Sequence, residues 1–296
     1  MMRMTVLASG SKGNSTLVSS SRTRILVDAG LSCRELLKRL QMAEEDPSRI
    51  DALLITHEHQ DHVQGVAVLA RKLGVPVYFT SATHRAWMRW MTPQKRLTYA
   101  EWLAQRQQPA EVEAEEEECA PTKEAPDPCR LPGVKYFTAG NGFSIGDIAV
   151  TPFTIPHDAA DPVGFVFEAD GVRIAIATDL GSMPPNVKMA IRNCDVLMLE
   201  SNHDLEMLRD GPYPWSVKQR VMSRVGHLSN EAAADFLEKN YDGNATYVVL
   251  AHLSECNNLP ELARVSAERA LRDRMSLLAN KLLLAQQEVP LEPICL

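Results

Sequence analysis

The sequence predicts an α+β protein built as an αββα sandwich, in which two facing mixed β-sheets carry helices on their outer faces. Two observations support this prediction. Each half of the 296-residue chain opens with short strands and continues with strand–helix units, and no repeat of fixed period runs through it. Elements in this order pack as two sheets around a shared core, with helices covering the sheet faces that would otherwise meet water.

In the first half, short apolar runs separated by Gly, Ser and Asn indicate strands. Ser32, followed three residues later by Glu35, is typical of a helix N-terminus because both side chains can cap free backbone amides. The expected strands are Thr5–Ala8, Ser15–Ser19, Arg24–Asp28, Ala52–Thr56 and Val75–Thr80, and the expected helices are Ser32–Gln41, Val63–Leu73 and Trp87–Trp102, the last interrupted at Pro93.

In the second half, the Asp170–Gly171 pair between two apolar runs predicts a β-hairpin, because both residues tolerate the positive φ angles of a tight turn. Strands are expected at Ile148–Thr154, Val163–Ala169, Arg173–Thr178, Val196–Glu200 and Thr246–Ala251, and helices at Val187–Arg192, Glu231–Lys239 and Pro260–Asn280.

Two segments stand apart from this pattern within what we expect to be a single domain spanning residues 1–296. Residues 105–132 contain a run of Glu, several Pro and few apolar residues, which is typical of an acidic, mobile insertion. Residues 259–296 are expected to form a helical C-terminal extension.

The net charge of −7 at first argues against a nucleic-acid partner. Six of the negative charges lie in the insertion, at Glu111, Glu113 and 115–118, which leaves about −1 for the rest of the chain. Overall charge therefore does not exclude a polyanionic substrate.

No segment of the sequence predicts membrane insertion or export. Apolar runs such as Val163–Phe167 are too short to span a bilayer, and residues 1–10 lack the long apolar region of a signal peptide. The six cysteines are scattered without a CxxC pair, which is typical of reduced thiols. We expect a cytoplasmic protein with no membrane partner.

The strongest functional signal is the motif THEHQDH at residues 56–62, which directly follows the expected strand Ala52–Thr56. Its ligand-type side chains are His57, His59, Asp61 and His62. Crowded imidazoles repel one another when protonated, and a carboxylate among them needs a compensating cation. A bound metal supplies that compensation, and Zn, Mn and Fe all accept imidazole and carboxylate ligands.

Further ligand-type residues follow the ends of later expected strands. These are His157, Asp179 and His252. Binding sites are usually built where strands meet loops. Taken with the first motif and in this order, the three residues predict one metal centre assembled from both halves of the chain.

The pattern HxHxDH, followed by His, Asp and His at strand ends, resembles the metallo-β-lactamase superfamily from Met4 to about Asn258. The resemblance implies two divalent metals, Zn or Mn with Fe as an alternative, and a metal-bridging hydroxide as the nucleophile. It places Glu58 at a variable position that is not a ligand. It implies His57, His59 and His157 at metal one, Asp61, His62 and His252 at metal two, and Asp179 bridging both, with Asp61 also orienting the hydroxide.

The segment GHLSN at residues 226–230 is similar to a motif of tRNase Z-like phosphodiesterases. The resemblance implies that His227 contacts the phosphate or protonates the leaving oxygen, and that Glu200 orients His227. A His–carboxylate pair suits general-acid chemistry, because the carboxylate fixes the tautomer and raises the imidazole pKa. Arg220 and Arg224 precede His227 and are either phosphate contacts or ordinary surface arginines.

A Gly/Ser turn, ASGSKGNS at residues 8–15, follows the first expected strand and can present backbone amides to an anion. Together with DAGLS at 28–32 and ESNHD at 200–204, it resembles the YycJ/WalJ-type subfamily. That resemblance implies a 5′-to-3′ DNA exonuclease, with DNA favoured over RNA as the substrate and a homodimer left open. The weaker substrate-binding candidates are Ser9, Ser11, Asn14 and Ser229.

The spacing of the motifs disfavours tRNA maturation. Asp179 follows His157 by 22 positions and precedes His252 by 73, too few for the additional domains of RNA-processing relatives. Fold alone does not select a substrate. A small-molecule metallo-hydrolase, thioesterase- or lactonase-like, is the alternative; it would not need the pair of His227 and Glu200.

Overall fold

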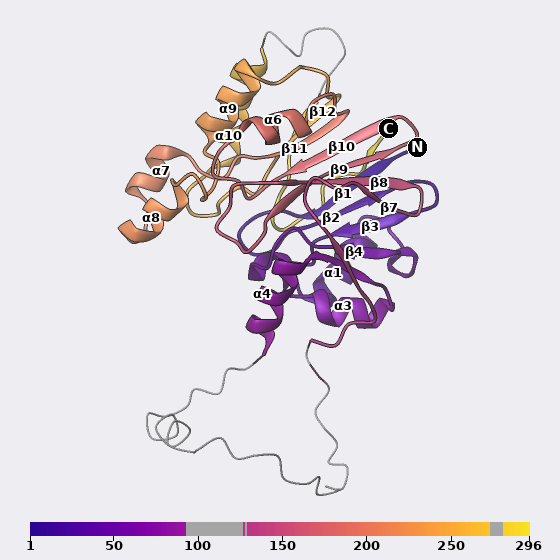
Figure 1. Cartoon of the computed structure of the whole chain (residues 1–296). Helices are drawn as coiled ribbons and strands as arrows, with labels where there is room; N and C mark the ends of the chain where they lie inside the picture. Colours follow the sequence, from indigo (N-terminus) through magenta and orange to yellow (C-terminus); the bar gives the residue numbers. More distant parts are fainter. Residues whose placement is uncertain (93–126, 128, 273–280) are drawn as a thin grey trace, which may run out of the picture.

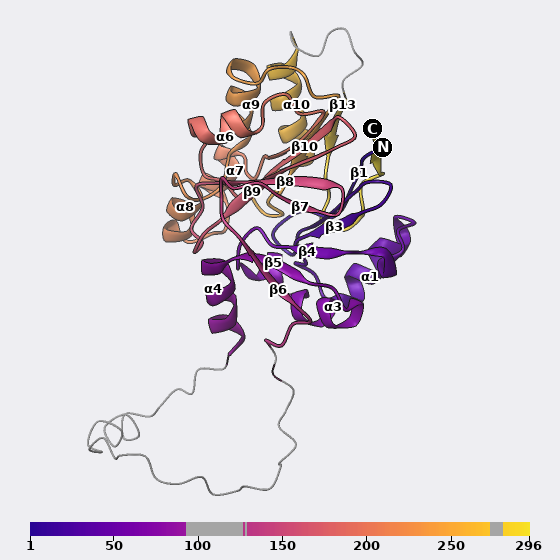
Figure 2. The same cartoon turned by 45° about the vertical axis from the view of Figure 1, so that its right-hand side comes forward.

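The computed structural model describes residues 1–92, 127, 129–272 and 281–296. Two seven-stranded mixed sheets face each other, and helices lie on both outer sides, which confirms the predicted αββα architecture (Figures 1 and 2). The predicted acidic insertion falls almost entirely outside the described residues.

The first sheet has the strand order β14-β1-β2-β3-β4-β5-β6. Helices α1 (Cys33–Met42), α3 (Val66–Leu73) and α4 (Ser81–Met91) cover its outer face (Figure 2). Its strands are β1 (Arg3–Ala8), β2 (Ser15–Ser19), β3 (Arg24–Val27), β4 (Ala52–Leu54), β5 (Val77–Thr80), β6 (Val134–Phe137) and β14 (Ile294–Cys295).

The second sheet has the order β13-β12-β11-β10-β9-β8-β7. Helices α6 (Pro185–Ala190), α9 (Asn230–Lys239) and α10 (Pro260–Leu271) cover its outer face. Its strands are β7 (Phe143–Ile145), β8 (Ile148–Thr154), β9 (Val163–Ala169), β10 (Val172–Ala177), β11 (Val196–Glu200), β12 (Tyr247–Ala251) and β13 (Lys281–Leu284).

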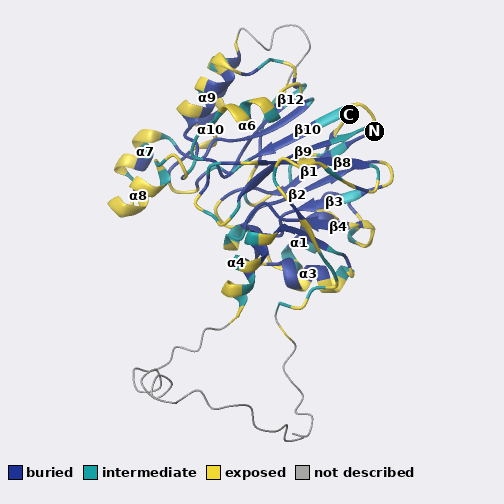
Figure 3. Ribbon diagram, in the orientation of Figure 1, coloured by how far each residue is buried: buried dark blue, intermediate teal, exposed yellow. Residues whose placement is uncertain are grey.

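Three hydrophobic clusters hold these layers together. One lies between the sheets and includes Ile25 and Phe165, and the other two join each sheet to its helices, for example through Trp87 and Phe236. Burying apolar surface in this way stabilises the folded chain by about 25 cal/mol per Å². Figure 3 shows that the strands are mostly buried, whereas the outer faces of the helices are exposed.

Local sequence signals explain several element boundaries. Ser32 caps α1 by accepting a hydrogen bond from the amide of Glu35, as predicted. The Asp170–Gly171 turn joins antiparallel β9 and β10 with positive φ at both residues, 52° and 76°, which confirms the predicted hairpin.

Other boundaries differ from the prediction. The expected helix Val63–Leu73 is divided into α2 (Gln60–Val63) and α3, and a Cβ at the intervening Gly65 would lie 2.2 Å from the carbonyl oxygen of Leu31. Helix α4 begins at Ser81 and not at Trp87, because Thr80 caps it by accepting from the amide of Thr83. The expected continuation of this helix to Trp102 lies outside the described residues.

The prediction of a helical extension over residues 259–296 was wrong for residues 281–296, and residues 273–280 lie outside the described residues. Lys281–Leu284 pairs in parallel with β12, and Ile294–Cys295 pairs antiparallel with β1. The end of the chain therefore belongs to both sheets. Strands β6 and β7 and helices α7 (Leu205–Asp210) and α8 (Trp215–Val221) were also not predicted. No helix among the described residues has the length and apolarity needed to cross a membrane.

Candidate metal centre

The predicted ligands come together because the strands that carry them end at one edge of the sandwich. Strands β10, β11 and β12 are parallel neighbours in register, with Ala177 opposite Leu199 and Glu200 opposite Ala251. Their carboxyl ends therefore lie side by side. Glu200 is the last residue of β11 there, and Asp179 and His252 follow β10 and β12. The THEHQDH turn reaches the same edge from β4 of the facing sheet, where the amide of Val163 donates to the Thr56 carbonyl.

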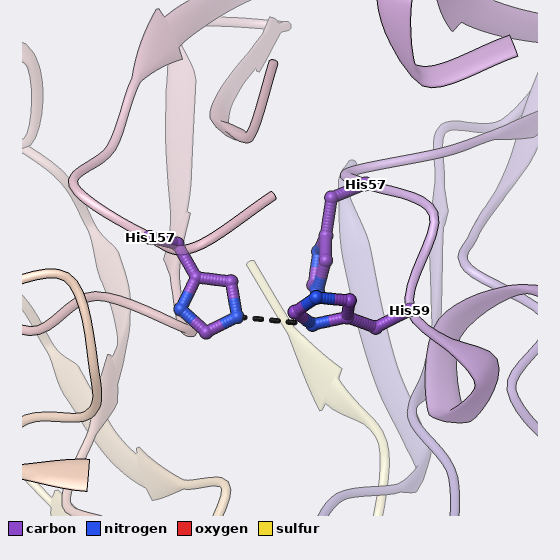
Figure 4. A group of neighbouring side chains, drawn as sticks. All are labelled: His57, His59 and His157. Carbon is purple, nitrogen blue, oxygen red and sulfur yellow. Dashed lines mark hydrogen bonds between the residues drawn. The ribbon is translucent and has the colours of Figure 1, made fainter. Parts of the chain in front are cut away.

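His57, His59 and His157 form one group whose ligand atoms all lie within 4.8 Å of one another. His157 Nε2 lies 3.2 Å from His59 Nδ1, and Figure 4 shows the three rings converging from the THEHQDH turn and the loop after β8. His57 and His157 are buried, whereas His59 is partly exposed.

Asp61, His62 and His252 form a second group with the same mutual spacing. Asp61 Oδ2 lies 3.5 Å from His62 Nε2 and 3.6 Å from His252 Nε2. Asp179 lies between the two groups, since its ligand atom also falls within 4.8 Å of those of His57 and His62. The structure thus brings together all seven residues named as ligands from the sequence.

Four of the imidazoles have one ring nitrogen held by a partner outside the cluster. His62 Nδ1 lies 2.8 Å from Asp28 Oδ2, and His252 Nδ1 lies 2.8 Å from Glu200 Oε1. Likewise, His157 Nδ1 lies 3.1 Å from the Gly226 carbonyl and His57 Nδ1 lies 3.0 Å from Thr56 Oγ1. Metal-binding histidines characteristically donate their second N–H in this way, which fixes the tautomer and the ring orientation.

Several buried atoms that face the cluster have no hydrogen-bond partner among the described residues. These are His57 Nε2, His252 Nε2 and Asp179 Oδ2. A buried polar atom without a partner costs about 1–3 kcal/mol, so three of them together need an external partner. Their nitrogen and oxygen donors fit divalent metal ions, which accept imidazole and carboxylate ligands.

The pKa shifts of Asp179 and His57 agree with this fit, whereas the carboxylates around His62 and His252 raise the pKa of both imidazoles, so a bound cation would replace a proton there. Burial would raise the pKa of the Asp179 carboxyl, but His252 and His62 hold it well below its usual range. Burial, followed by the charge of His62, lowers the pKa of His57 well below that of free imidazole. An ionised carboxylate and a neutral imidazole are the protonation states that bind a cation.

The fourth ligand-type group in this region, which contains Asp179, Glu200, His227 and His252, is better explained as a hydrogen-bonded network than as a metal site. Glu200 Oε1 faces the Nδ1 atoms of His227, at 2.9 Å, and His252, at 2.8 Å. Glu200 Oε2 accepts from the backbone amides of Leu180 and Leu228. Both carboxylate oxygens are therefore occupied, and His227 and His252 hold the pKa of Glu200 at about 2 although burial opposes this.

Three residues at the site adopt left-handed backbone conformations. The φ angles are 59° at Asp28, 59° at Asp179 and 56° at His252. Such angles cost free energy for residues other than Gly and persist where the surrounding structure fixes them, frequently at functional sites. Each of the three follows the last residue of a strand by one or two positions, so the strained turn directs its side chain to the cluster.

A cavity of about 310 Å³ opens onto the cluster. His59, Asp61, Asp179, His227 and His252 line it, which places four of the seven candidate ligands and His227 at one cavity. The remaining lining residues include Ser11, Asn202, Tyr213, Arg220, Ser254 and Asn257.

The four weaker substrate-binding candidates have different surroundings. Ser11 lines the cavity. Ser9 is buried and its hydroxyl accepts from the amide of His252, Asn14 Nδ2 lies 3.3 Å from Asp61 Oδ2, and Ser229 caps α9 by accepting from the Ala232 amide. These contacts give Ser9, Asn14 and Ser229 positioning roles in the folded chain.

Sequence reasoning assigned no role to Asp28, although the structure makes it the partner of His62. Its Oδ1 accepts from the amide of Thr56 and its Oδ2 from the Thr56 hydroxyl, so it also fixes the start of the THEHQDH turn. The available signal was a lone Asp at the end of an apolar strand, before Ala29 and Gly30. Tyr213 on the cavity wall carried no sequence signal, and Asn202 was noted only as part of the ESNHD motif, without a role of its own.

Comparison with known proteins adds three findings. A family model described as the β-lactamase superfamily domain matches residues 23–253, a span that contains all seven candidate ligands. The chain is 34% identical over 273 residues to "Exodeoxyribonuclease YycJ" of Bacillus anthracis, covering 92% of this chain and 90% of the relative. It is also 34% identical over 264 residues to "Exodeoxyribonuclease WalJ" of Streptococcus pneumoniae, covering 89% of this chain and 86% of the relative.

Solved structures agree with the fold. The metallo-β-lactamase fold protein YhfI from Bacillus subtilis superposes with a TM-score of 0.64 at 15% identity, covering 98% of each chain.

Proposed function

Because this chain belongs to the β-lactamase superfamily and, within it, to the family of YycJ and WalJ, we propose that it is a dinuclear metal-dependent phosphodiesterase that acts as a 5′-to-3′ DNA exonuclease. Both relatives carry the name exodeoxyribonuclease and match this chain over about nine-tenths of its length. The observation that carries the proposal is the pairing of His227 with Glu200 beside a cluster of metal-type ligands.

In this proposal His57, His59 and His157 hold one divalent ion, and Asp61, His62 and His252 hold the other. Asp179 contacts both, which its place between the two groups supports. Zn or Mn suits these N and O donors, and Fe is an alternative. When bound, such ions would activate water as the nucleophile and offset the negative charge that develops on a phosphoryl oxygen.

His227 supplies the proton in this proposal. Its Nδ1 is held by Glu200, so Nε2 is the ring atom available to a substrate in the cavity that His227 lines. The buried Glu200 carboxylate fixes the orientation of the ring through Nδ1. Cleavage of a P–O bond requires protonation of a poor leaving group such as a deoxyribose oxygen. A small-molecule hydrolase with an activated leaving group would gain little from this pair.

DNA hydrolysis by the metal-loaded chain tests the proposal. The chain is loaded with Mn²⁺ or Zn²⁺ and incubated with 5′-phosphorylated duplex DNA, unphosphorylated duplex DNA and single-stranded RNA. We expect stepwise release of nucleotides from DNA 5′ ends. Release of nucleotides from RNA but not from DNA would overturn the choice of substrate.

Two variants in the same turn show whether the metal site performs the reaction. Asp61→Asn removes a proposed ligand charge and should abolish release. Glu58→Gln is its matched control, because the Glu58 carboxylate accepts from the amide of Ala160 and belongs to neither ligand group. Equal activity of Asp61→Asn and Glu58→Gln would contradict the proposed site.

A further inference from the structure

One wall of the metal cavity comes from the segment that joins α7 to α8 and from α8 itself. Tyr213, Arg220 and Val221 line this wall. Among the described residues, Arg220 is the only Lys or Arg that lines the cavity, which two carboxylates, Asp61 and Asp179, also line. A substrate with more than one phosphate therefore meets one fixed side-chain cation outside the proposed metal positions.

Arg220 is held in place from one side only. Its Nε donates to Asp158 Oδ2, and Oδ1 of the same carboxylate lies 3.5 Å from His157 Nε2. The guanidinium is thus anchored beside the first ligand group, although 60% of the Arg220 side chain remains exposed. Within the described residues its terminal Nη groups have no hydrogen-bond partner, so they are available to a ligand.

The chemistry of the guanidinium selects the kind of ligand. A planar fork of N–H donors matches the oxygens of a phosphate and binds two of them at once. In the proposed reaction, the scissile phosphate lies at the two ligand groups and beside His227. Arg220, anchored at the rim of the same cavity, is then placed for the neighbouring phosphate of the strand.

Tyr213 complements Arg220 on this wall. Its side chain is partly buried at the cavity, and its hydroxyl makes no hydrogen bond to any residue that the structure describes. A partly buried aromatic ring without a polar tether is suited to stacking, and nucleic-acid bases stack on tyrosine without regard to sequence.

We propose that Arg220 binds the phosphate adjoining the scissile one and that Tyr213 stacks on the base between them, so that this wall makes the cavity specific for a polynucleotide strand. The inference rests on the proposed function and deepens it. The ligand is a stretch of at least two linked nucleotides, and the wall contributes to binding and not to the chemical step.

Steady-state hydrolysis of a DNA oligonucleotide by Arg220→Gln tests the proposal. Losing one good charge-assisted contact should raise KM about 10- to 100-fold with kcat changed less than threefold. The slope of log KM against log salt concentration should fall by about one, because one phosphate contact is lost. Arg220→Lys should lie between wild type and Arg220→Gln, because it keeps the charge but not the fork.

Arg224→Gln is the matched control. It removes the same charge four residues further along, from an exposed arginine that does not line the cavity. KM and the salt slope of this variant should stay within twofold of wild type. If Arg224→Gln and Arg220→Gln raise KM equally, the loss of any nearby positive charge weakens DNA binding, and the proposed phosphate contact of Arg220 is wrong.

A purely positioning role for Arg220 through Asp158 and His157 makes a different prediction. In that case Arg220→Gln would lower metal content and kcat and leave the salt slope unchanged, which would overturn the proposal. Metal stoichiometry by mass spectrometry provides that readout. If the wild-type chain hydrolyses no oligonucleotide, the proposed function itself fails. If the wild-type chain is active and Arg220→Gln has the same KM, only the proposed role of Arg220 fails.

The Tyr213 ring is tested separately by comparing two substitutions. Tyr213→Phe keeps the aromatic face and should bind the oligonucleotide like wild type, whereas Tyr213→Ala should raise KM about tenfold. Trp215→Ala is the control, since Trp215 begins α8 and is 62% exposed but does not line the cavity. Equal KM values for Tyr213→Phe and Tyr213→Ala would refute stacking.

Discussion

Glu200 Oε1 accepts a hydrogen bond from His227 Nδ1 across 2.9 Å. The same oxygen lies 2.8 Å from Nδ1 of His252, a candidate metal ligand. One buried carboxylate therefore orients both the proposed proton donor and a proposed ligand, so changes at Glu200 and at His227 should have different consequences.

Replacing His227 should damage the chemical step alone. We expect His227→Ala to lower kcat on DNA about 10²- to 10⁴-fold, the usual contribution of a general acid, with metal content unchanged. The loss should be much smaller on bis(p-nitrophenyl) phosphate, because a p-nitrophenolate leaving group needs no proton. His84→Phe is the control, since His84 stacks on Phe79 away from the cavity. An equal loss on both substrates would rule out proton donation by His227.

Replacing Glu200 should damage both the chemical step and metal binding. Glu200→Gln keeps the shape but offers one oxygen to four donors, namely two imidazole N–H groups and the amides of Leu180 and Leu228. We expect kcat on DNA to fall at least about tenfold and metal affinity to fall about 10- to 100-fold. Isothermal titration with Zn²⁺, beside kinetics at saturating metal, separates the two effects. Unchanged metal affinity would show that Glu200 serves His227 alone.

Asp28 should influence the metal through His62. Asp28→Asn removes the charged acceptor of His62 Nδ1, and loss of such an outer partner typically weakens metal binding about 10- to 100-fold. Competition with a chromophoric chelator measures the change. Asp147→Asn is the matched control, because that carboxylate accepts from Ser20 and Thr23 beside β8 and belongs to no ligand group. Equal metal affinities for the two variants would show that Asp28 does not support metal binding through His62.

Metal removal should destabilise the fold. A cluster of carboxylates and imidazoles within 4.8 Å of one another is costly without cations, and a ligand that binds only the folded state at about a thousand times its Kd stabilises it by about 4 kcal/mol. Calorimetry before and after dialysis against a chelator should show a clear fall in Tm. Chelation should lower the Tm of Asp179→Asn much less than that of wild type, because Asp179 lies between the two ligand groups. A chelator-insensitive Tm in wild type would contradict the metal centre.

The ligand set was predictable because it follows from local patterns. Alternation within THEHQDH and the strand-end positions of His157, Asp179 and His252 were visible in the sequence, and parallel pairing of β10, β11 and β12 then brings those ends together. Most helices and strands could be predicted for the same reason, since apolar periodicity and caps such as Ser32 are local.

The features that escaped prediction depend on contacts distant in sequence. Asp28 becomes a partner of His62 only through the pairing of β3 with β4, and nothing near Asp28 indicates this. The strands Lys281–Leu284 and Ile294–Cys295 are short, and each is defined by a neighbour, β12 or β1, and not by its own pattern. Tyr213 reaches the cavity because α7 and α8 fold beside it, which no local motif encodes.

The most direct test of a dinuclear phosphodiesterase is the hydrolysis of 5′-labelled duplex DNA as metal is returned to the metal-free chain. We predict that activity rises to its maximum at two equivalents of Mn²⁺ or Zn²⁺ per chain and that Asp61→Asn stays inactive throughout. If the fully loaded chain leaves DNA intact and instead hydrolyses a thioester or lactone, the metal centre stands but the nuclease assignment is wrong.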